Sequence, residues 1–553
     1  TIAYFEDMFR EELEGHKLLS NKSIWRNFPV VSNQNWYHEN VVLIGDAAHT
    51  AQFSIGSGTK IAMEGAISLL KSIEEEGSIS SALTEYQEKR EIEISRLQRS
   101  AMVSLQWYEN ARRYNDLTPP QYAFNFLSRS KSVTYENLKL RDVRYGREVN
   151  SWYASLVRKE QGFDIPDDPA PPPMFTPYRL RDLVFQNRVV VSPMCQYSAN
   201  DGTPTDWHLV HLGGFAVGGA GLVYAEMTNV SAAGRITPGC AGMYKPEHVE
   251  AWKRVTSFIH QNSRAKICMQ LAHAGRKGST KYPWHGEDEP LENGNWPLIS
   301  ASPLPYKEFN QVPKEMTRDD MDDVLDSFVR ATRMAEEAEF DMIEIHMAHG
   351  YLLSSFISPV SNVRRDEYGG ELVNRLKFPV EILKAVRSVW PNSKPISCRI
   401  SATDWLDSGG LTGEDAVEVA KLLYENGCDI IDVSAGQTTP QAKPIYGRMF
   451  QTHLSEQVRL EAKGPTIAVG NITSADQVNT IVAAGRADLV ALARPHLTDP
   501  HFTLKAAAHY GYTPQFWPEQ YLAGKAQAER LAEQDNIRLQ EILLANRPQS
   551  HSQ

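Results

Sequence analysis

A chain of 553 residues with 42% hydrophobic residues, 23% charged residues and a net charge of -11 has the composition of a multidomain globular protein. It carries no basic excess that would attract nucleic acid, and no run of eighteen apolar residues that would span a membrane. Its five cysteines include no CxxC pair, which argues against an iron–sulfur or zinc site and against a disulfide framework. We therefore expect a cytoplasmic protein without nucleic-acid or membrane partners.

Helix-forming and charged residues dominate the amino-terminal part of the chain, residues 1–163, most clearly over 78–104 and 121–157. A strand pattern followed by a helix pattern occurs there only over 40–70. The boundary of this part is the proline-rich stretch DIPDDPAPPP, residues 164–173. Because proline fixes an extended backbone and has no amide donor, we expect a semi-rigid linker there.

After the linker, short apolar runs alternate with helical stretches eight times. Continuous apolar runs, each followed by a helix, indicate a parallel sheet that is covered on its outer side, and eight such units close into a barrel. The predicted fold is therefore α/β, a (β/α)8 barrel over 174–523 with a carboxyl-terminal tail over 524–553. The loop-like stretch 278–313 is expected to cover the face where the strands end. The apolar runs are 188–194, 221–227, 266–271, 342–346, 396–400, 430–434, 466–470 and 489–493.

Polar side chains stand at or just after the carboxyl ends of these predicted strands, which meet at one face of a barrel. In the run EIHMAHGYLL, His346 and His349 are followed closely by Tyr351. Two imidazoles at a strand end can hold one oxygen of a substrate while a phenol transfers a proton. On the residues alone, two structural histidines or two metal ligands also fit this pattern. The polar residues at strand ends are Cys195, Gln270, His346, His349, Arg399 and Arg494.

The barrel region, roughly residues 174–521, resembles the old yellow enzyme family of flavin-dependent ene reductases. The resemblance rests on separated motifs in a fixed order. It implies an FMN cofactor, NADH or NADPH as reductant, and an unsaturated carbonyl compound as substrate. The motifs are SPMCQYS at 192–198, MQLAHAGRK at 269–277, IHMAHGYL at 345–352, RRDEYGG at 364–370 with NR at 374–375, CRIS at 398–401, AVGN at 468–471 and ARP at 493–495.

The resemblance gives most polar strand ends a role in binding FMN. Gln270 can donate and accept hydrogen bonds together, which matches the alternating amide edge of a flavin ring. Arg399 keeps its charge at any pH and would stabilise the reduced ring. The loops after the last two strands form the usual phosphate site of barrels. The residues expected to form the apolar bed and the phosphate site are Pro193, Met194, Met227, Gly470, Asn471, Ala493 and Arg494.

The resemblance also assigns the residues that meet the substrate. We expect His346 and His349 to hold the carbonyl oxygen and Tyr351 to donate the proton. Cys195 is expected to adjust the reduction potential of the flavin rather than to act as a nucleophile. Tyr197 is expected to contact the substrate.

Two departures from the family pattern carry information. Related dienoyl-CoA reductases have a cysteine cluster for an iron–sulfur centre after the barrel, whereas no cysteine follows Cys428 here. Many relatives also have an arginine that reaches into a neighbouring subunit, and Ala523 stands at that place. We still expect a homo-oligomer, but without this arginine contact.

The segment VVLIGDAAHTAQFSIGSGTKIAMEGA, residues 41–66, resembles the second flavin-binding motif of FAD-dependent aromatic monooxygenases. Its apolar strand would deliver the Asp46 carboxylate to ribityl hydroxyls, and Gly56 and Gly58 would open a helix toward the flavin. No GxGxxG dinucleotide fingerprint precedes it. We therefore expect the carboxyl part of an FAD domain from a longer fusion, which by itself binds little FAD.

Such a fusion implies a two-step oxidoreductase. The FAD domain would hydroxylate and dearomatise an aromatic acyl-CoA, and the FMN barrel would reduce the resulting enone with NADH or NADPH. No separate coenzyme A motif is present. The alternatives are a stand-alone ene reductase for small enones with a relic amino-terminal domain, and an amino-terminal domain that serves only in assembly.

Overall fold

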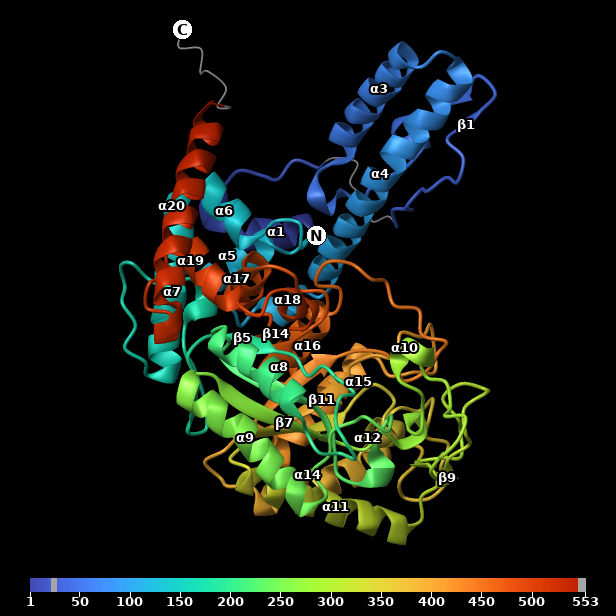
Figure 1. Cartoon of the computed structure of the whole chain (residues 1–553). Helices are drawn as coiled ribbons and strands as arrows, with labels where there is room; N and C mark the ends of the chain where they lie inside the picture. The colour runs from blue at the N-terminus through green and yellow to red at the C-terminus, as the bar shows by residue number, and fades with distance from the viewer. Residues whose placement is uncertain (21–26, 546–553) are drawn as a thin grey trace. The chain divides into compact units, whose positions relative to one another are not determined.

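The computed structural model describes residues 1–20 and 27–545 and divides into two compact units, Thr1–Asn110 and Ala111–Gln553 (Figure 1). The first unit is built on a helical hairpin whose helices bury Ile61, Tyr86 and Ile94 around Trp36. Its two strands, β1 and β2, are short and pair over only two residues each. The elements are α1 Ile2–Met8, α2 Arg10–Leu13, β1 Tyr37–His38, β2 Val41–Val42, α3 Gly58–Glu75 and α4 Ile79–Glu109.

The second unit contains a closed barrel of eight parallel strands, which confirms the predicted (β/α)8 fold. Every predicted apolar run forms one barrel strand, with ends that shift by a few residues. The strands in chain order are β5 Val189–Val191, β6 Leu222–Asn229, β7 Lys266–Ala272, β10 Met342–Met347, β11 Ile396–Ser401, β12 Ile430–Ser434, β13 Thr466–Ala468 and β14 Leu489–Leu492.

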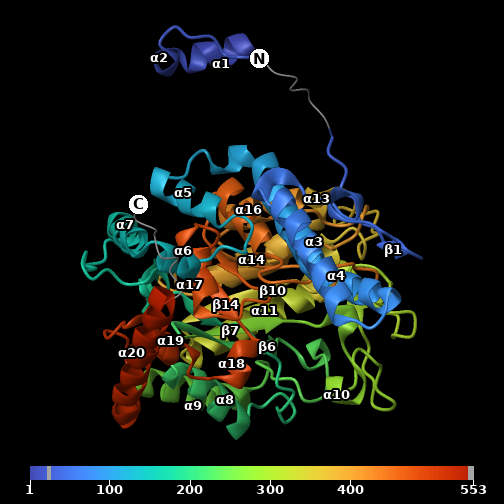
Figure 2. The same ribbon diagram turned by 90° about the horizontal axis from the view of Figure 1, so that it is seen from above.

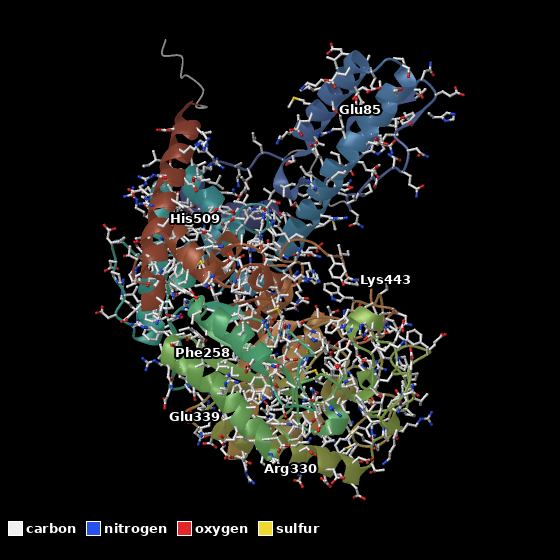
Figure 3. All side chains as sticks on the ribbon, in the orientation of Figure 1. Glu85, Phe258, Arg330, Glu339, Lys443 and His509 are labelled. Atoms are coloured by element: carbon white, nitrogen blue, oxygen red, sulfur yellow. The ribbon has the colours of Figure 1, made fainter. Side chains whose placement is uncertain are left out.

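Amphipathic helices surround the barrel, and α8, α9 and α11 pack on its outside (Figures 1 and 2). Helix α11 illustrates why these segments form helices that pack on the barrel. It begins at the capping box of Thr317 and Asp320, and it buries Met321, Val324 and Phe328 at helical spacing. The helices include α8 Asp206–Val217, α9 Pro246–Asn262, α11 Arg318–Glu337, α12 Leu352–Ile357, α13 Leu372–Arg375, α14 Lys377–Val389, α15 Gly413–Glu425, α16 Thr452–Glu461, α17 Ala475–Ala483, α18 Arg494–Thr498 and α19 Phe502–Tyr510. Charged side chains such as Arg330 and Glu339 lie on the outer surface (Figure 3).

The barrel interior changes from apolar to polar along the strands. The layer at the amino ends packs Val190, Leu222, Met342 and Ile430, together with the hairpin of β3 Tyr178–Leu180 and β4 Leu183–Phe185. Toward the carboxyl ends, buried polar side chains of β7, β10, β11 and β12 replace them. The polar end of the barrel is therefore the end at which a ligand can be bound.

The compact units do not divide at the proline-rich stretch where we expected the domain boundary. Three helices precede it, α5 Pro119–Leu127, α6 Tyr135–Arg141 and α7 Val143–Gln161 (Figures 1 and 2). Helices α5 and α6 contact α17, and α7 packs against α5 and α6. Their apolar faces share core clusters with the barrel unit, because Phe124 and Tyr135 pack with Ala483 and Ala484. The segment 111–163 thus belongs to the barrel unit.

Two other segments contain secondary structure that the sequence analysis did not predict. The expected tail forms the helix α20 Leu522–Ala545 over most of its length. The loop 278–313 contains α10 Pro283–Gly286 and the strand β8 Ile299–Ser300, which pairs with β9 Lys314–Glu315. Over residues 1–20 and 27–545, no helix combines the length and the apolar character needed to cross a membrane.

Candidate active site

The histidine pair lies at the carboxyl end of β10, on the polar side of the barrel. His346 is inside the strand, in register with Arg399 on β11. His349 adopts a φ of +62° and Gly350 a φ of +75°, so the chain turns sharply directly after the strand. The turn brings the ring centroids of His346 and His349 to 5.1 Å, and Tyr351 lies 5.1 Å from His346. The three predicted residues therefore form one cluster.

Both imidazoles are held neutral by their surroundings. Burial lowers the pKa of His346 and His349 well below the ordinary value, and the positive charges of Arg399 and Lys277 lower it further. The backbone amide of Ala348 donates to Nδ1 of His346 at 3.4 Å. A neutral imidazole that accepts at Nδ1 carries its proton on Nε2, so His346 presents an N–H donor.

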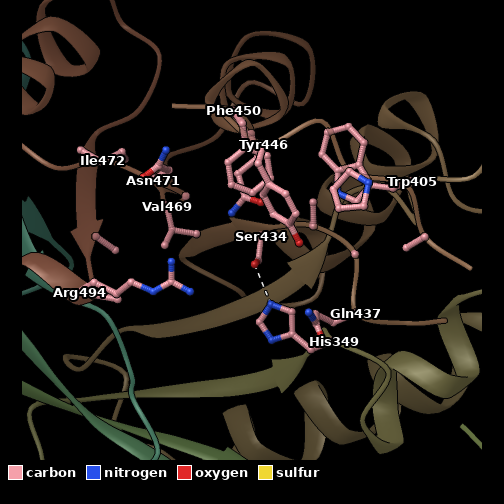
Figure 4. A pocket seen from close by; sticks show the side chains of 18 of the residues that line it. His349, Trp405, Ser434, Gln437, Tyr446, Phe450, Val469, Asn471, Ile472 and Arg494 are labelled. Carbon is pink, nitrogen blue, oxygen red and sulfur yellow. Dashed lines mark hydrogen bonds between the residues drawn. The ribbon is translucent and has the colours of Figure 1, made fainter. Parts of the chain in front are cut away.

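Two residues outside our predicted set hold His349. Its Nε2 lies 2.7 Å from the Ser434 hydroxyl (Figure 4), and its backbone carbonyl accepts from Nζ of Lys277 at 3.1 Å. Burial lowers the pKa of Lys277 to about 8. Lys277 belongs to the motif at 269–277, so the sequence offered a signal for it. Ser434 only ends an apolar strand and gave none.

A buried polar layer lies directly below the histidines. Gln270 on β7 donates from Nε2 to Glu344 on β10 at 2.8 Å, and Ser397 on β11 donates to the other Glu344 oxygen at 2.9 Å. The neighbouring Arg399 guanidinium lies 3.4 Å from Asp432. Burial raises the pKa of Glu344 to about 8 and also raises that of Asp432. This network fixes the Gln270 amide, and the Gln270 oxygen accepts no hydrogen bond from any residue that the structure describes.

A second cluster gathers the remaining predicted substrate-side residues. Cys195, Tyr197 and Tyr351 pack against a buried cluster that includes Met227 and Cys240. Burial raises the pKa of the Cys195 thiol well above its ordinary value, so the sulfur is protonated and weakly nucleophilic. The loop 278–313 reaches this cluster, because Trp284 lies edge-on to Tyr197 at 5.9 Å. Pro193 and Met194 are partly buried beside it, and Met194 packs against the main barrel core.

A cavity of about 620 Å³ opens where β12, β13 and β14 end (Figure 4). All four residues expected at the phosphate site, Gly470, Asn471, Ala493 and Arg494, line it together with His349. A Cβ atom at Gly470 would lie 2.4 Å from Cγ of Gln451, and the φ there is +114°, so glycine is required. The cavity wall does not include His346, Gln270 or Cys195.

An aromatic wall faces Arg494 across this cavity, and our sequence analysis missed it (Figure 4). Trp405 and Phe450 are stacked with ring centroids 6.2 Å apart, and Tyr446 lies edge-on to Phe450 at 5.2 Å. The Arg494 side chain has no hydrogen bond or ion pair with any residue that the structure describes. The cavity thus offers an unpaired cation on one side and flat apolar rings on the other.

The predicted FAD-contacting residues all lie in the first compact unit. Asp46 is exposed on a short 3-10 turn, because the strand before it ends at Val42. Gly56 has a φ of +65° and Gly58 is the first residue of α3, as the helix-opening role requires. The role of these residues remains a prediction.

Comparison with known proteins decides the family. Residues 173–511 match the model of the NADH:flavin oxidoreductase / NADH oxidase family, which is most of the chain and the whole barrel. The chain belongs to this family. Its barrel is therefore that of an NAD(P)H-dependent flavin oxidoreductase of the old yellow enzyme type, as the motifs predicted.

Other family members resemble the barrel along nearly their entire length. An NADPH dehydrogenase from Geobacillus sp. (strain WCH70) is 43% identical over 342 residues, which are 62% of this chain and 95% of that protein. An NADPH dehydrogenase from Clostridium acetobutylicum is 38% identical over 335 residues, 60% of this chain and 94% of that protein.

Two solved structures of reductases have the same fold. Morphinone reductase in complex with tetrahydroNAD matches with a TM-score of 0.51 and 25% identity over 60% of this chain and 90% of that chain. The 2-naphthoyl-CoA reductase in complex with 2-naphthoyl-CoA matches with a TM-score of 0.55 and 23% identity. Here the match covers 60% of this chain and 52%, about half, of the reductase.

Proposed function

We propose that the barrel binds FMN and reduces the carbon–carbon double bond of an unsaturated carbonyl compound. The observation that carries this proposal is the cluster of His346, His349 and Tyr351 at the polar end of the barrel. Two neutral imidazoles and a phenol within one cluster suit a substrate oxygen that gains negative charge during the reaction.

The residues present fit an FMN cofactor. The cavity ends in the unpaired Arg494 cation, which suits a phosphate, and Gly470 leaves room that a side chain would fill. The aromatic wall of the cavity suits a flat ring. Outside the cavity wall, the amide oxygen of Gln270 suits a polar ring edge. When bound, FMN would supply the hydride-transfer chemistry between NADH or NADPH and the substrate.

The protein's own groups would position the substrate and manage one proton. Nε2–H of His346 donates to the carbonyl oxygen, and the His349 ring, held by Ser434, provides the second contact. One such donor contributes about 3 kcal/mol when charge develops on the oxygen. Burial raises the pKa of Tyr351 well above its ordinary value, so this phenol keeps its proton until the substrate accepts it.

We further propose that the first unit is the carboxyl part of an FAD monooxygenase domain and that the substrate is an aromatic acyl-CoA. This arrangement resembles 2-aminobenzoyl-CoA monooxygenase/reductase and its salicylyl-CoA 5-hydroxylase/oxidoreductase relatives. The helix that begins at Gly58 and the left-handed Gly56 support the motif. In this proposal the FMN barrel reduces the enone that hydroxylation creates.

One experiment tests the two levels separately. Flavins released from the purified chain are identified by mass spectrometry, and NADPH oxidation is followed with 2-cyclohexenone. We expect near-stoichiometric FMN, little FAD and enone-dependent turnover. Absence of FMN would refute the ene reductase proposal. For the finer proposal, a longer natural fusion should contain FAD and FMN and turn over an aromatic CoA thioester; FMN alone would leave only the ene reductase.

A further inference from the structure

A segment outside the region shared with the family reaches the wall of the candidate cofactor cavity. Lys131 lies in the turn between α5 and α6, whereas the family match begins at residue 173. Its Nζ donates to the backbone carbonyl of Met449 at 2.9 Å. Met449 belongs to the loop 435–451, which follows β12 and carries Tyr446, Phe450 and Gln451 into the cavity wall.

The carbonyl that Lys131 contacts belongs to a strained and cross-linked part of this loop. Met449 has a φ of +52°, a conformation that a side chain other than glycine adopts only when its surroundings hold it there. Its amide donates to the Asn471 carbonyl at 3.1 Å, and the Asn471 side chain donates to the Gly447 carbonyl at 2.8 Å. Lys131 and Asn471 therefore restrain the same loop from two sides.

Lys131 can act as a fixed point because its own segment is anchored in the barrel unit. Asn125 donates to Glu456 at 2.7 Å and to the Ala484 carbonyl at 2.9 Å. On the other side of the turn, the Tyr135 amide donates to Thr480 at 2.9 Å. These contacts join the turn to α16 and α17.

We propose that Lys131 is a positioning residue for the cofactor cavity, because it ties the loop 435–451 to the helical segment 111–163 and so sets how tightly FMN is held. This inference rests on the proposed FMN binding. It adds to the family barrel a support that lies outside the matched residues 173–511. Burial lowers the pKa of Lys131 to about 8, so the ammonium form that donates to the carbonyl predominates at neutral pH.

The test compares Lys131→Met, which removes the donor, with Lys131→Arg, which keeps one. The matched control is Lys139→Met: Lys139 lies in the same segment, over the ring of Tyr510, and none of its described contacts reaches the loop. Loss of a charge-assisted hydrogen bond should raise the FMN dissociation constant about tenfold in Lys131→Met. We expect less than a threefold change in Lys131→Arg and none in Lys139→Met.

A readout without FMN separates positioning from general stability. In the FMN-free protein, amide hydrogen exchange of residues 440–451 should be about tenfold faster in Lys131→Met, while exchange in β10 and β11 stays unchanged. In a double-mutant cycle with Asn471→Ala, the two changes in FMN affinity should be less than additive because both residues restrain one loop. Should Lys131→Met not fold, Lys131→Gln is measured in the same way.

The outcomes distinguish this inference from the proposed function. Failure of the unsubstituted protein to bind FMN refutes the proposed cofactor, and the exchange measurement alone then decides whether Lys131 holds the loop. Normal FMN binding by the unsubstituted protein, with unchanged affinity and loop exchange in the Lys131 variant, overturns the positioning role. Equal losses in the Lys131 and Lys139 variants also overturn it.

Discussion

At the scale of single residues, one substitution distinguishes three roles for the histidine pair: substrate binding, a structural role and metal binding. Substituting His346→Ala removes one donor to the substrate oxygen and leaves the cavity wall intact, since His346 does not line the cavity. FMN should therefore stay bound, and reduction of the flavin by NADPH should be nearly unchanged. Reoxidation by an enone should slow by about 100-fold or more. Stopped-flow measurement of each half-reaction checks this.

The control is His248→Ala, because His248 is a fully buried histidine on α9 that does not line the cavity. It should lower the melting temperature without separating the two half-reactions. If His346 were structural, its variant would behave in the same way. If the pair bound a metal, a chelator would reproduce the effect of the substitution. An unimpaired reaction with the enone would contradict the assignment.

Buried neutral histidines also predict how stability depends on pH. His273 accepts a hydrogen bond from the Gly275 amide, and burial lowers its pKa from 6.5 to about 4. Between these values the unfolded state binds the proton and the folded state does not, so stability falls as pH drops below about 6.5. From pH 7 to pH 5 this residue should account for a loss of about 2 kcal/mol.

Urea unfolding at the two pH values, followed by tryptophan fluorescence, measures this loss. His273→Gln should make the pH dependence shallower by about that amount. The remaining dependence should come from the other histidines whose pKa burial lowers, which include His211, His346, His349, His453 and His496. An equal pH dependence in the variant and the unsubstituted protein would show that His273 is not held neutral by burial.

At the scale of secondary structure, the barrel strands could be predicted because their signal is local. A strand such as Ile430–Ser434 is buried on both faces, so its apolar residues are continuous in the sequence. The strand expected before Asp46 is shorter in the structure than its apolar run indicated. Only Val41 and Val42 pair there, and Ile44 remains exposed, so the apolar run did not reflect burial in a sheet.

Residues of the candidate site could be predicted only where they belong to a recognisable sequence motif. The histidine pair and the four residues expected at the phosphate site stand at strand ends, so topology alone brings them to one face. Trp405, Tyr446 and Phe450 come from two different loops, and their contact depends on how those loops fold back over the barrel. No local sequence pattern indicates that residues of two separate loops will be in contact.

At the scale of the whole molecule, the position of the segment 111–163 was not predictable from its composition. Helix-forming residues indicate that α5, α6 and α7 exist, but they do not tell which core their apolar faces enter. The proline-rich stretch suggested a boundary because proline favours extended linkers. In the structure Pro173 instead begins a short buried turn against α17, where the Met174 amide donates to Asn479 at 2.9 Å.

This arrangement predicts opposite outcomes for two truncations. A chain that starts at residue 111 keeps the compact barrel unit and should fold and bind FMN as the longer chain does. A chain that starts at residue 164 loses Phe124, Tyr135, Val149, Tyr153 and Val157, which are all buried against the barrel or one another. Five such side chains contribute on the order of 10 kcal/mol, which is comparable to the entire stability of a domain.

We therefore expect the shorter chain to be insoluble or to melt far below the longer one, as measured by circular dichroism and flavin content. A variant of the longer chain with only Tyr153→Ala serves as an intermediate case and should lose about 3 to 5 kcal/mol. A shorter chain that folds with the same melting temperature and full FMN content would show that the helices of 111–163 do not contribute to the stability of the barrel. That result would also contradict the proposal that Lys131 restrains the loop 435–451.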